Sequence, residues 1–122
     1  MTVVLDASAI LAFLAAEPGA DVVEAALEDA AFCSTVNWSE VAQKVRAGGG
    51  DWSVAAALLA SYGLTTADAT VQDADAAAAL WRRGSGMSLA DRFCLALATR
   101  LDAAALTADT AWGSSGSVRQ IR

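Results

Sequence analysis

The sequence contains no histidine, only one lysine (Lys44) and only two cysteines among its 122 residues. The lack of histidine excludes Ser-His-Asp triads, histidine-based acid–base ribonucleases and His-ligated zinc sites. Cys33 and Cys94 lie far apart and form no CxxC pair, so we interpret them as small core residues of a protein in the reducing cytoplasm. The glycine triplet at 48–50 is followed by Asp51, not by the lysine of a phosphate-binding loop. Carboxylates and hydroxyls are therefore the main groups left for catalysis.

Long apolar runs are also missing, since no segment reaches the ~18 residues that a membrane span needs. The segment 3–16 is apolar, but it contains Asp6 and follows no Lys or Arg, so we predict no secretory signal. The length suits a single domain, 1–122, and 56% apolar residues with 18% charged residues argue against disorder. Alanine fills little volume, so the core is thin, and we expect the chain to form a homodimer.

Strand and helix patterns alternate along the chain. Short β-branched or apolar runs predict strands at 3–5, 31–34, 64–67, 104–107 and 118–121. Apolar spacing of three and four residues, with caps and glycine stops, predicts helices at 7–16, 21–30, 37–47, 52–62, 71–83 and 88–101. This alternation indicates βαβ units, and therefore an α/β fold with a doubly wound parallel sheet.

Four acidic residues stand at the predicted strand–helix junctions: Asp6, Glu40, Asp91 and Asp109. Each has an ordinary structural explanation. Asp6 follows a strand as a helix N-cap, and Asp109 would brace the turn before Trp112. Glu40 follows Asn37, and Asp91 follows Ser88, at the three-residue spacing of a capping box. Lys44 also offers Glu40 an i,i+4 partner.

Considered together, the four acids point to a metal site. In a parallel sheet, the carboxyl ends of the strands and the amino ends of the following helices share one edge, where ligands bind. Four ionised carboxylates there would repel one another unless a cation lay among them. An all-oxygen ligand set selects Mg²⁺ or Mn²⁺ over zinc. Removing these four charges also changes the net charge from −6 to −2, which weakens the objection that the chain is too acidic to bind nucleic acid.

Such a site suits the hydrolysis of phosphodiesters, in which a metal-bound water attacks phosphorus in line. Basic residues near the edge would hold the nucleic-acid backbone. Arg82, Arg83 and Arg92 flank the helix start at Ser88 and are the leading candidates for substrate binding. Arg46, Arg119 and Arg122 are further candidates. For each arginine, a solvated surface charge is an equally good interpretation.

The motifs around the acids resemble those of PIN-domain proteins and, more closely, of the VapC toxins of bacterial toxin–antitoxin pairs. They are Val-Leu-Asp6-Ala-Ser8-Ala, Asn37-Trp-Ser-Glu40-Val, Ser88-Leu-Ala-Asp91 and Leu-Thr107-Ala-Asp109-x-x-Trp112. The resemblance spans nearly the whole chain. It implies a three-layer sandwich around a parallel sheet, Mg²⁺-dependent RNA cleavage, homodimerisation and inhibition by a cognate antitoxin. It implies that the four acids are the catalytic and metal-binding residues. Ser8 and Thr107 match polar positions that would hold metal-bound water or position Asp109.

Two other functions stay open. A receiver-type phosphoacceptor has a similar length and an acidic edge, but it needs paired acids after the first strand and a late lysine, whereas Asp6 stands alone and Lys44 comes early. A non-catalytic PIN-like module would bind RNA or protein without cutting. For the antitoxin, we predict a basic segment whose arginine enters the acidic edge. Trp38 or Trp52 would offer an apolar groove beside that edge unless both belong to the core.

Overall fold

The computed structural model describes residues 1–122, which form an α/β fold around a five-stranded sheet with the strand order β3-β2-β1-β4-β5. Every neighbouring pair of strands is parallel, as predicted. The strands are β1 (Thr2–Leu5), β2 (Ala30–Ser34), β3 (Thr65–Ala67), β4 (Ala104–Thr107) and β5 (Val118–Gln120). The chain order reverses about β1, so the gap between the carboxyl ends of β1 and β4 is a topological switch point. Ligands bind at such points in open parallel sheets.

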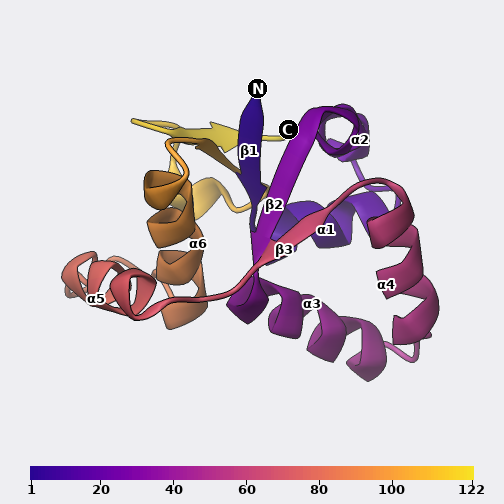
Figure 1. Ribbon diagram of the computed structural model, residues 1–122, viewed down its shortest axis with the longest axis horizontal. Helices are drawn as coiled ribbons and strands as arrows, with labels where there is room; N and C mark the ends of the chain where they lie inside the picture. Colours follow the sequence, from indigo (N-terminus) through magenta and orange to yellow (C-terminus); the bar gives the residue numbers. More distant parts are fainter.

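Helices cover both faces of the sheet and make the three predicted layers (Figure 1). They are α1 (Ala7–Leu14), α2 (Ala20–Asp29), α3 (Thr35–Ala47), α4 (Trp52–Ser61), α5 (Val71–Ala79), α6 (Leu89–Arg100) and the 3₁₀ helix η1 (Thr110–Trp112). Side chains alternate along β1, as in any strand. Val3 and Leu5 pack against α1 and α2, whereas Val4 packs beneath α6. None of these helices has both the length and the apolar character that a membrane crossing requires.

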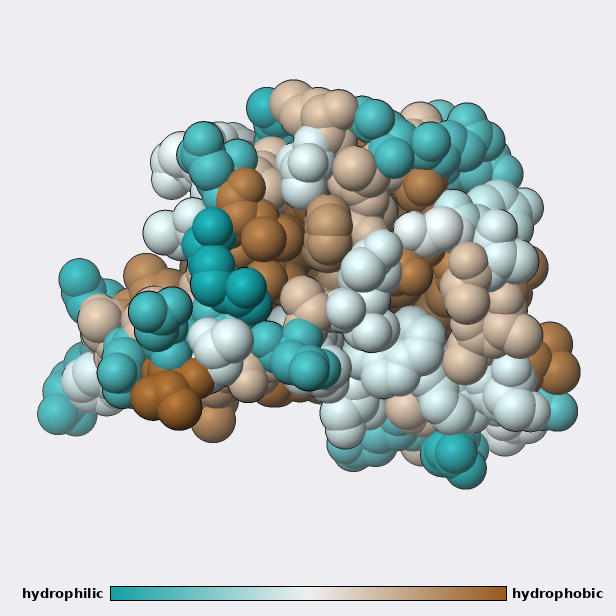
Figure 2. Space-filling model, in the orientation of Figure 1, coloured by the Kyte–Doolittle hydropathy of each residue, from teal (hydrophilic) through white to brown (hydrophobic).

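The core is thin, as the abundance of alanine predicts. Its largest completely buried side chains include Leu5, Ile10, Leu59 and Leu97, and alanines fill much of the remainder. Several large apolar side chains are exposed at the surface, where hydrophobic and hydrophilic residues lie side by side (Figure 2). They include Val54, Leu58, Leu80, Trp81 and Leu89. Such exposed apolar groups are candidates for contact with another chain.

Three helix boundaries differ from the predicted ones by two residues or more. Helix α1 ends at Leu14, not at residue 16. Helix α3 begins at Thr35, not at Asn37, because the Ser34 hydroxyl accepts a hydrogen bond from the Val36 amide and caps the helix earlier. Helix α5 ends at Ala79, four residues before the predicted end at residue 83. There the Arg82 guanidinium donates hydrogen bonds to the carbonyl oxygens of Ala79 and Trp81. These bonds take the place of the helical hydrogen bonds that end there.

Candidate active site

Asp6 lies at the switch point, directly after β1, and its carboxylate is almost completely buried. Oδ1 accepts hydrogen bonds from the Ala9 amide at 2.8 Å and the Ser8 hydroxyl at 2.7 Å. Oδ2 accepts from the Thr107 hydroxyl at 2.6 Å. Burial raises the pKa of Asp6 in spite of these hydrogen bonds, and the negative charge of Asp91 raises it further. The protein therefore holds a carboxylate at a place where its charge is poorly compensated.

Ser8 and Thr107 connect the ends of β1 and β4 around this carboxylate. Their hydroxyl oxygens lie 3.2 Å apart. The Ser8 hydroxyl also accepts from the Ala108 amide, and the Thr107 hydroxyl accepts from the Asp109 amide. The two polar residues singled out in the sequence thus meet at Asp6, and Thr107 joins Asp6 to the backbone of Asp109.

Glu40 lies in the second turn of α3, and its main contact is Asn37. The Asn37 amide nitrogen donates to Glu40 Oε1 at 2.9 Å and to the carbonyl oxygen of Ala90 at 3.0 Å. The predicted capping box at Asn37 is wrong, because Ser34 caps the helix and Asn37 is already inside it. Lys44 forms no ion pair with Glu40. Sequence reasoning missed the role of Asn37, since its second partner comes from another helix.

Asp91 lies in the first turn of α6 and forms the predicted capping box with Ser88. The Asp91 amide donates to the Ser88 hydroxyl, and the Ser88 amide donates to Asp91 Oδ2. Asp109 follows β4 and is exposed. Its Oδ1 accepts from the Ala111 amide and caps η1, which is the turn-bracing contact predicted for it.

Three of the four acids converge on one region, beneath which lie two buried thiols. Burial raises the pKa of Cys33 to about 12, and the charges of Asp6 and Glu40 add to this shift. The pKa of Cys94 is also raised, first by burial and then by charges that include those of Asp6, Asp91 and Glu40. Asp6, Glu40 and Asp91 therefore lie near the same part of the core.

The converging acids have no basic partner within the chain. All three ion pairs lie elsewhere: Met1 with Asp29, Arg100 with Asp73, and Arg122 with Glu17. In the present side-chain arrangement, no three acidic side chains are close enough together to hold one metal ion jointly. Each carboxylate is turned toward the intramolecular donors described above.

The three leading arginines have structural contacts of their own. Arg82 binds main-chain carbonyls at the end of α5, and the Arg83 guanidinium lies 5.7 Å from the centre of the Trp81 ring. Arg92 donates to the carbonyl oxygen of Ala77 and so ties the start of α6 to the end of α5. Arg82 and Arg83 are exposed next to the helix that carries Asp91, whereas Arg92 is partly buried.

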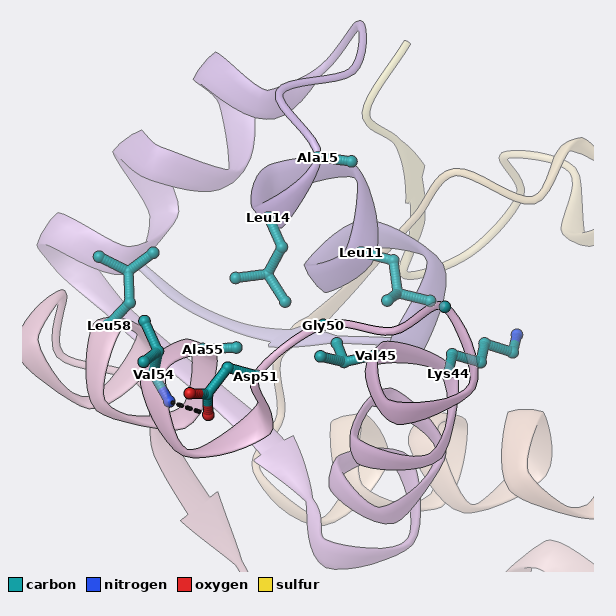
Figure 3. Close-up of a pocket in the computed structure, with 11 residues that line it drawn as sticks. Leu11, Leu14, Ala15, Lys44, Val45, Gly50, Asp51, Val54, Ala55 and Leu58 are labelled. Carbon is teal, nitrogen blue, oxygen red and sulfur yellow. Dashed lines mark hydrogen bonds between the residues drawn. The ribbon is translucent and has the colours of Figure 1, made fainter.

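A separate apolar groove lies between α1, α3 and α4, with a volume of about 430 Å³ (Figure 3). Leu11 and Leu14 reach into it from α1, and Val54 and Leu58 from α4. Its remaining lining residues are Ala15, Lys44, Val45, Gly48, Gly50, Asp51 and Ala55. Trp38 and Trp52 are partly buried, and their rings pack edge to face with 4.8 Å between the ring centres. Both also pack against the core cluster that contains Val41 and Leu59. The two tryptophans thus help to support the core and do not line the groove.

Comparisons with known proteins agree with this architecture. The family model of the PIN domain matches residues 3–114. No curated protein sequence matches the chain. Among solved structures, a toxin–antitoxin complex from Klebsiella pneumoniae has a TM-score of 0.78 at 18% identity, covering 98% of each chain. Mycobacterium tuberculosis VapC20, described as a toxin that cleaves the sarcin–ricin loop, has a TM-score of 0.74 at 18% identity, covering 93% of this chain and 95% of its own. DNA-bound VapBC from Salmonella typhimurium has a TM-score of 0.72 at 13% identity, covering 100% and 99%.

Proposed function

The chain belongs to the PIN-domain family, and from this premise we propose that it is a metal-dependent endoribonuclease, the toxin of a type II toxin–antitoxin pair. One observation supports this most directly: Asp6 is buried at the switch point of the sheet, Glu40 and Asp91 lie near it, and none of the three has a basic partner. The structural neighbours among VapC toxins share the fold and make the toxin role the first to test.

The residues present fit Mg²⁺ or Mn²⁺. The donors are all carboxylate and hydroxyl oxygens, which suit hard divalent cations. Mg²⁺ usually keeps several of its waters and needs only one or two carboxylates, so the lack of three close carboxylates is no obstacle. Asp6 and Asp91 would hold the ion, and Glu40 and Asp109 are the further acids expected to bind it. The raised pKa of Asp6 is the kind of electrostatic cost that a bound cation removes.

A divalent ion bound there would polarise the scissile phosphate and lower the pKa of an attacking water. The residues of this chain would complete the site. Glu40 has one oxygen held by Asn37 and the other free, so it can accept the proton of the attacking water. Ser8 and Thr107 keep Asp6 oriented. The exposed guanidinium groups of the 82–83 pair would hold the RNA backbone.

Cleavage of a labelled RNA with and without Mg²⁺ tests the proposal. Asp91→Asn should abolish cleavage, because it removes the charge while its amide oxygen can still accept from the Ser88 amide and preserve the cap. Asp75→Asn, an exposed acid outside the site, is the matched control and should cut normally. Equal cleavage by both variants, or full activity in excess chelator, would reject the metal-dependent mechanism.

We further propose that the groove between α1, α3 and α4 receives an apolar segment of the antitoxin. Val54 and Leu58 are 64% and 41% exposed there, which is unfavourable unless another chain covers them. A neighbouring basic part of the antitoxin would enter the acidic edge with an arginine, whose planar fork pairs with a carboxylate.

Replacing Val54 by aspartate should weaken antitoxin binding by at least tenfold in a titration, while thermal stability stays unchanged because the side chain is exposed. Val22→Asp is the control, because Val22 is a similarly surface-exposed valine on α2, away from the groove. The partner to titrate is the product of the small gene that we expect immediately upstream of the gene for this chain. Identical affinities for both variants would exclude the groove as the docking site.

The expected homodimer also stays a proposal. Leu80, Trp81 and Leu89 are exposed around the end of α5 and the start of α6, and a second copy of the chain would bury them. Light scattering at micromolar concentrations should report twice the mass of the 12.4 kDa chain. A monomer throughout that range would contradict the proposal.

A further inference from the structure

Asn37 is a buried polar side chain next to the acids, with 1% of its surface exposed. Its amide nitrogen has two hydrogens, and they go to two acceptors, Glu40 Oε1 and the Ala90 carbonyl oxygen. The flipped amide would place an oxygen against both acceptors, so only this orientation is possible. Its own oxygen has no partner in the chain. Burying an amide with an unpaired oxygen is costly, so the two donated bonds must serve a purpose.

Those two bonds connect two of the site's acids across different helices. Glu40 belongs to α3, and Ala90 directly precedes Asp91 in the first turn of α6. The helices pack together at this end (Figure 1). The single amide group of Asn37 is thus hydrogen-bonded both to a carboxylate oxygen of Glu40 and to the backbone beside Asp91. No other side-chain hydrogen bond joins α3 to α6.

We propose that Asn37 is a positioning residue, which sets the Glu40 carboxylate relative to Asp91 so that both act on the same divalent ion. This rests on the proposed function, because it requires that the acids bind a metal. Partners that orient a metal ligand from outside typically contribute 10–100-fold to metal affinity. Asn37 also leaves the second oxygen of Glu40 free. Its own unpaired oxygen is available to a water molecule in the site.

Calorimetric titration with Mn²⁺ tests the proposal on four proteins: the wild type, Asn37→Ala, Glu40→Gln and the double variant. Asn37→Ala should weaken Mn²⁺ binding by about tenfold or more in the wild-type background. In the Glu40→Gln background the same substitution should change the affinity much less, because the group that Asn37 orients has already lost its charge. A general loosening of the fold would lower the affinity equally in both backgrounds. Ser39→Ala, on the exposed side of the same helix, should bind Mn²⁺ like the wild type.

The possible failures are distinguishable. An equal loss in both backgrounds, or no loss, overturns the positioning role of Asn37 and leaves the metal site intact. Unchanged affinity in Glu40→Gln shows that Glu40 does not act on the metal, which also overturns the role of Asn37. If the wild type binds no Mn²⁺, the proposed function fails with it. Asn37→Ser replaces Asn37→Ala in the cycle if circular dichroism shows that the alanine variant is unfolded.

Discussion

Replacing Asp6 by asparagine should stabilise the metal-free protein, although Asp6 is buried and makes several hydrogen bonds. Its raised pKa means that burial disfavours the charged form by more than those hydrogen bonds favour it. Asparagine has the same shape and no charge. Its oxygen can keep the bonds from Ala9 and Ser8, and its nitrogen can donate to the Thr107 hydroxyl. The Thr107 proton then turns to Ser8, whose oxygen lies 3.2 Å away.

The expected gain in unfolding free energy is on the order of 1 kcal/mol at pH 7, the size typical of single stabilising substitutions. It should depend on pH in a definite direction. An acid whose pKa is raised by folding costs stability as the pH increases from its unfolded value, about 3.9, through its folded value. The difference between Asp6→Asn and the wild type should therefore be small at pH 3 and largest at neutral pH. Asp75→Asn, which removes an exposed charge, should show no such trend.

Chemical denaturation in chelator at several pH values measures this difference, and repeating it with Mg²⁺ tests the metal site. At a metal concentration of 100 times Kd, the wild type should gain about 2.7 kcal/mol by mass action, and Asp6→Asn should gain far less. A metal-free Asp6→Asn protein that is less stable than the wild type at pH 7 would refute the argument that burial dominates. Equal metal stabilisation of both proteins would remove Asp6 from the set of ligands.

Three other predictions concern the rest of the molecule. Arg100→Ala should destabilise the protein by about 1–3 kcal/mol at pH 7 by leaving the buried Asp73 without its partner. Because the hydrogen bond from Arg100 lowers the pKa of Asp73, this loss should shrink in urea denaturation as the pH falls below about 4. Cys33 and Cys94 should resist a thiol reagent at pH 8 until the protein unfolds, because both thiols are buried and burial raises the pKa of Cys33 to about 12. Rapid labelling of the native protein would contradict this. Leu59→Ala should lower the free energy of unfolding by about 2–5 kcal/mol in the same denaturation assay, since Leu59 is completely buried. A loss below about 1 kcal/mol would show that the core collapses around the missing side chain.

The sequence by itself was sufficient for the features that depend on neighbouring residues. The alternation of strands and helices predicted the parallel sheet, and all five strands lie within about a residue of their expected places. The capping box at Ser88 and Asp91 and the helix cap at Asp6 were also correct. In each case the two partners lie within one turn, so their spacing along the chain determines whether they meet. The position of Asp6 directly after a buried strand placed it at the carboxyl end of the sheet, because the carboxyl ends of parallel strands share one edge.

Only the tertiary structure decided how the acids are held. The bond from Thr107 to Asp6 spans 101 residues, and the bond from Asn37 to Ala90 spans 53. Spacing suggested that Asn37 caps a helix, whereas packing of α3 against α6 makes it a link between two helices. The exposure of Asp109 and the burial of Asp6 likewise follow from how β4, α1 and α6 assemble. Such contacts join segments whose separation in space depends on the packing of the whole fold, and local spacing carries no information about that packing.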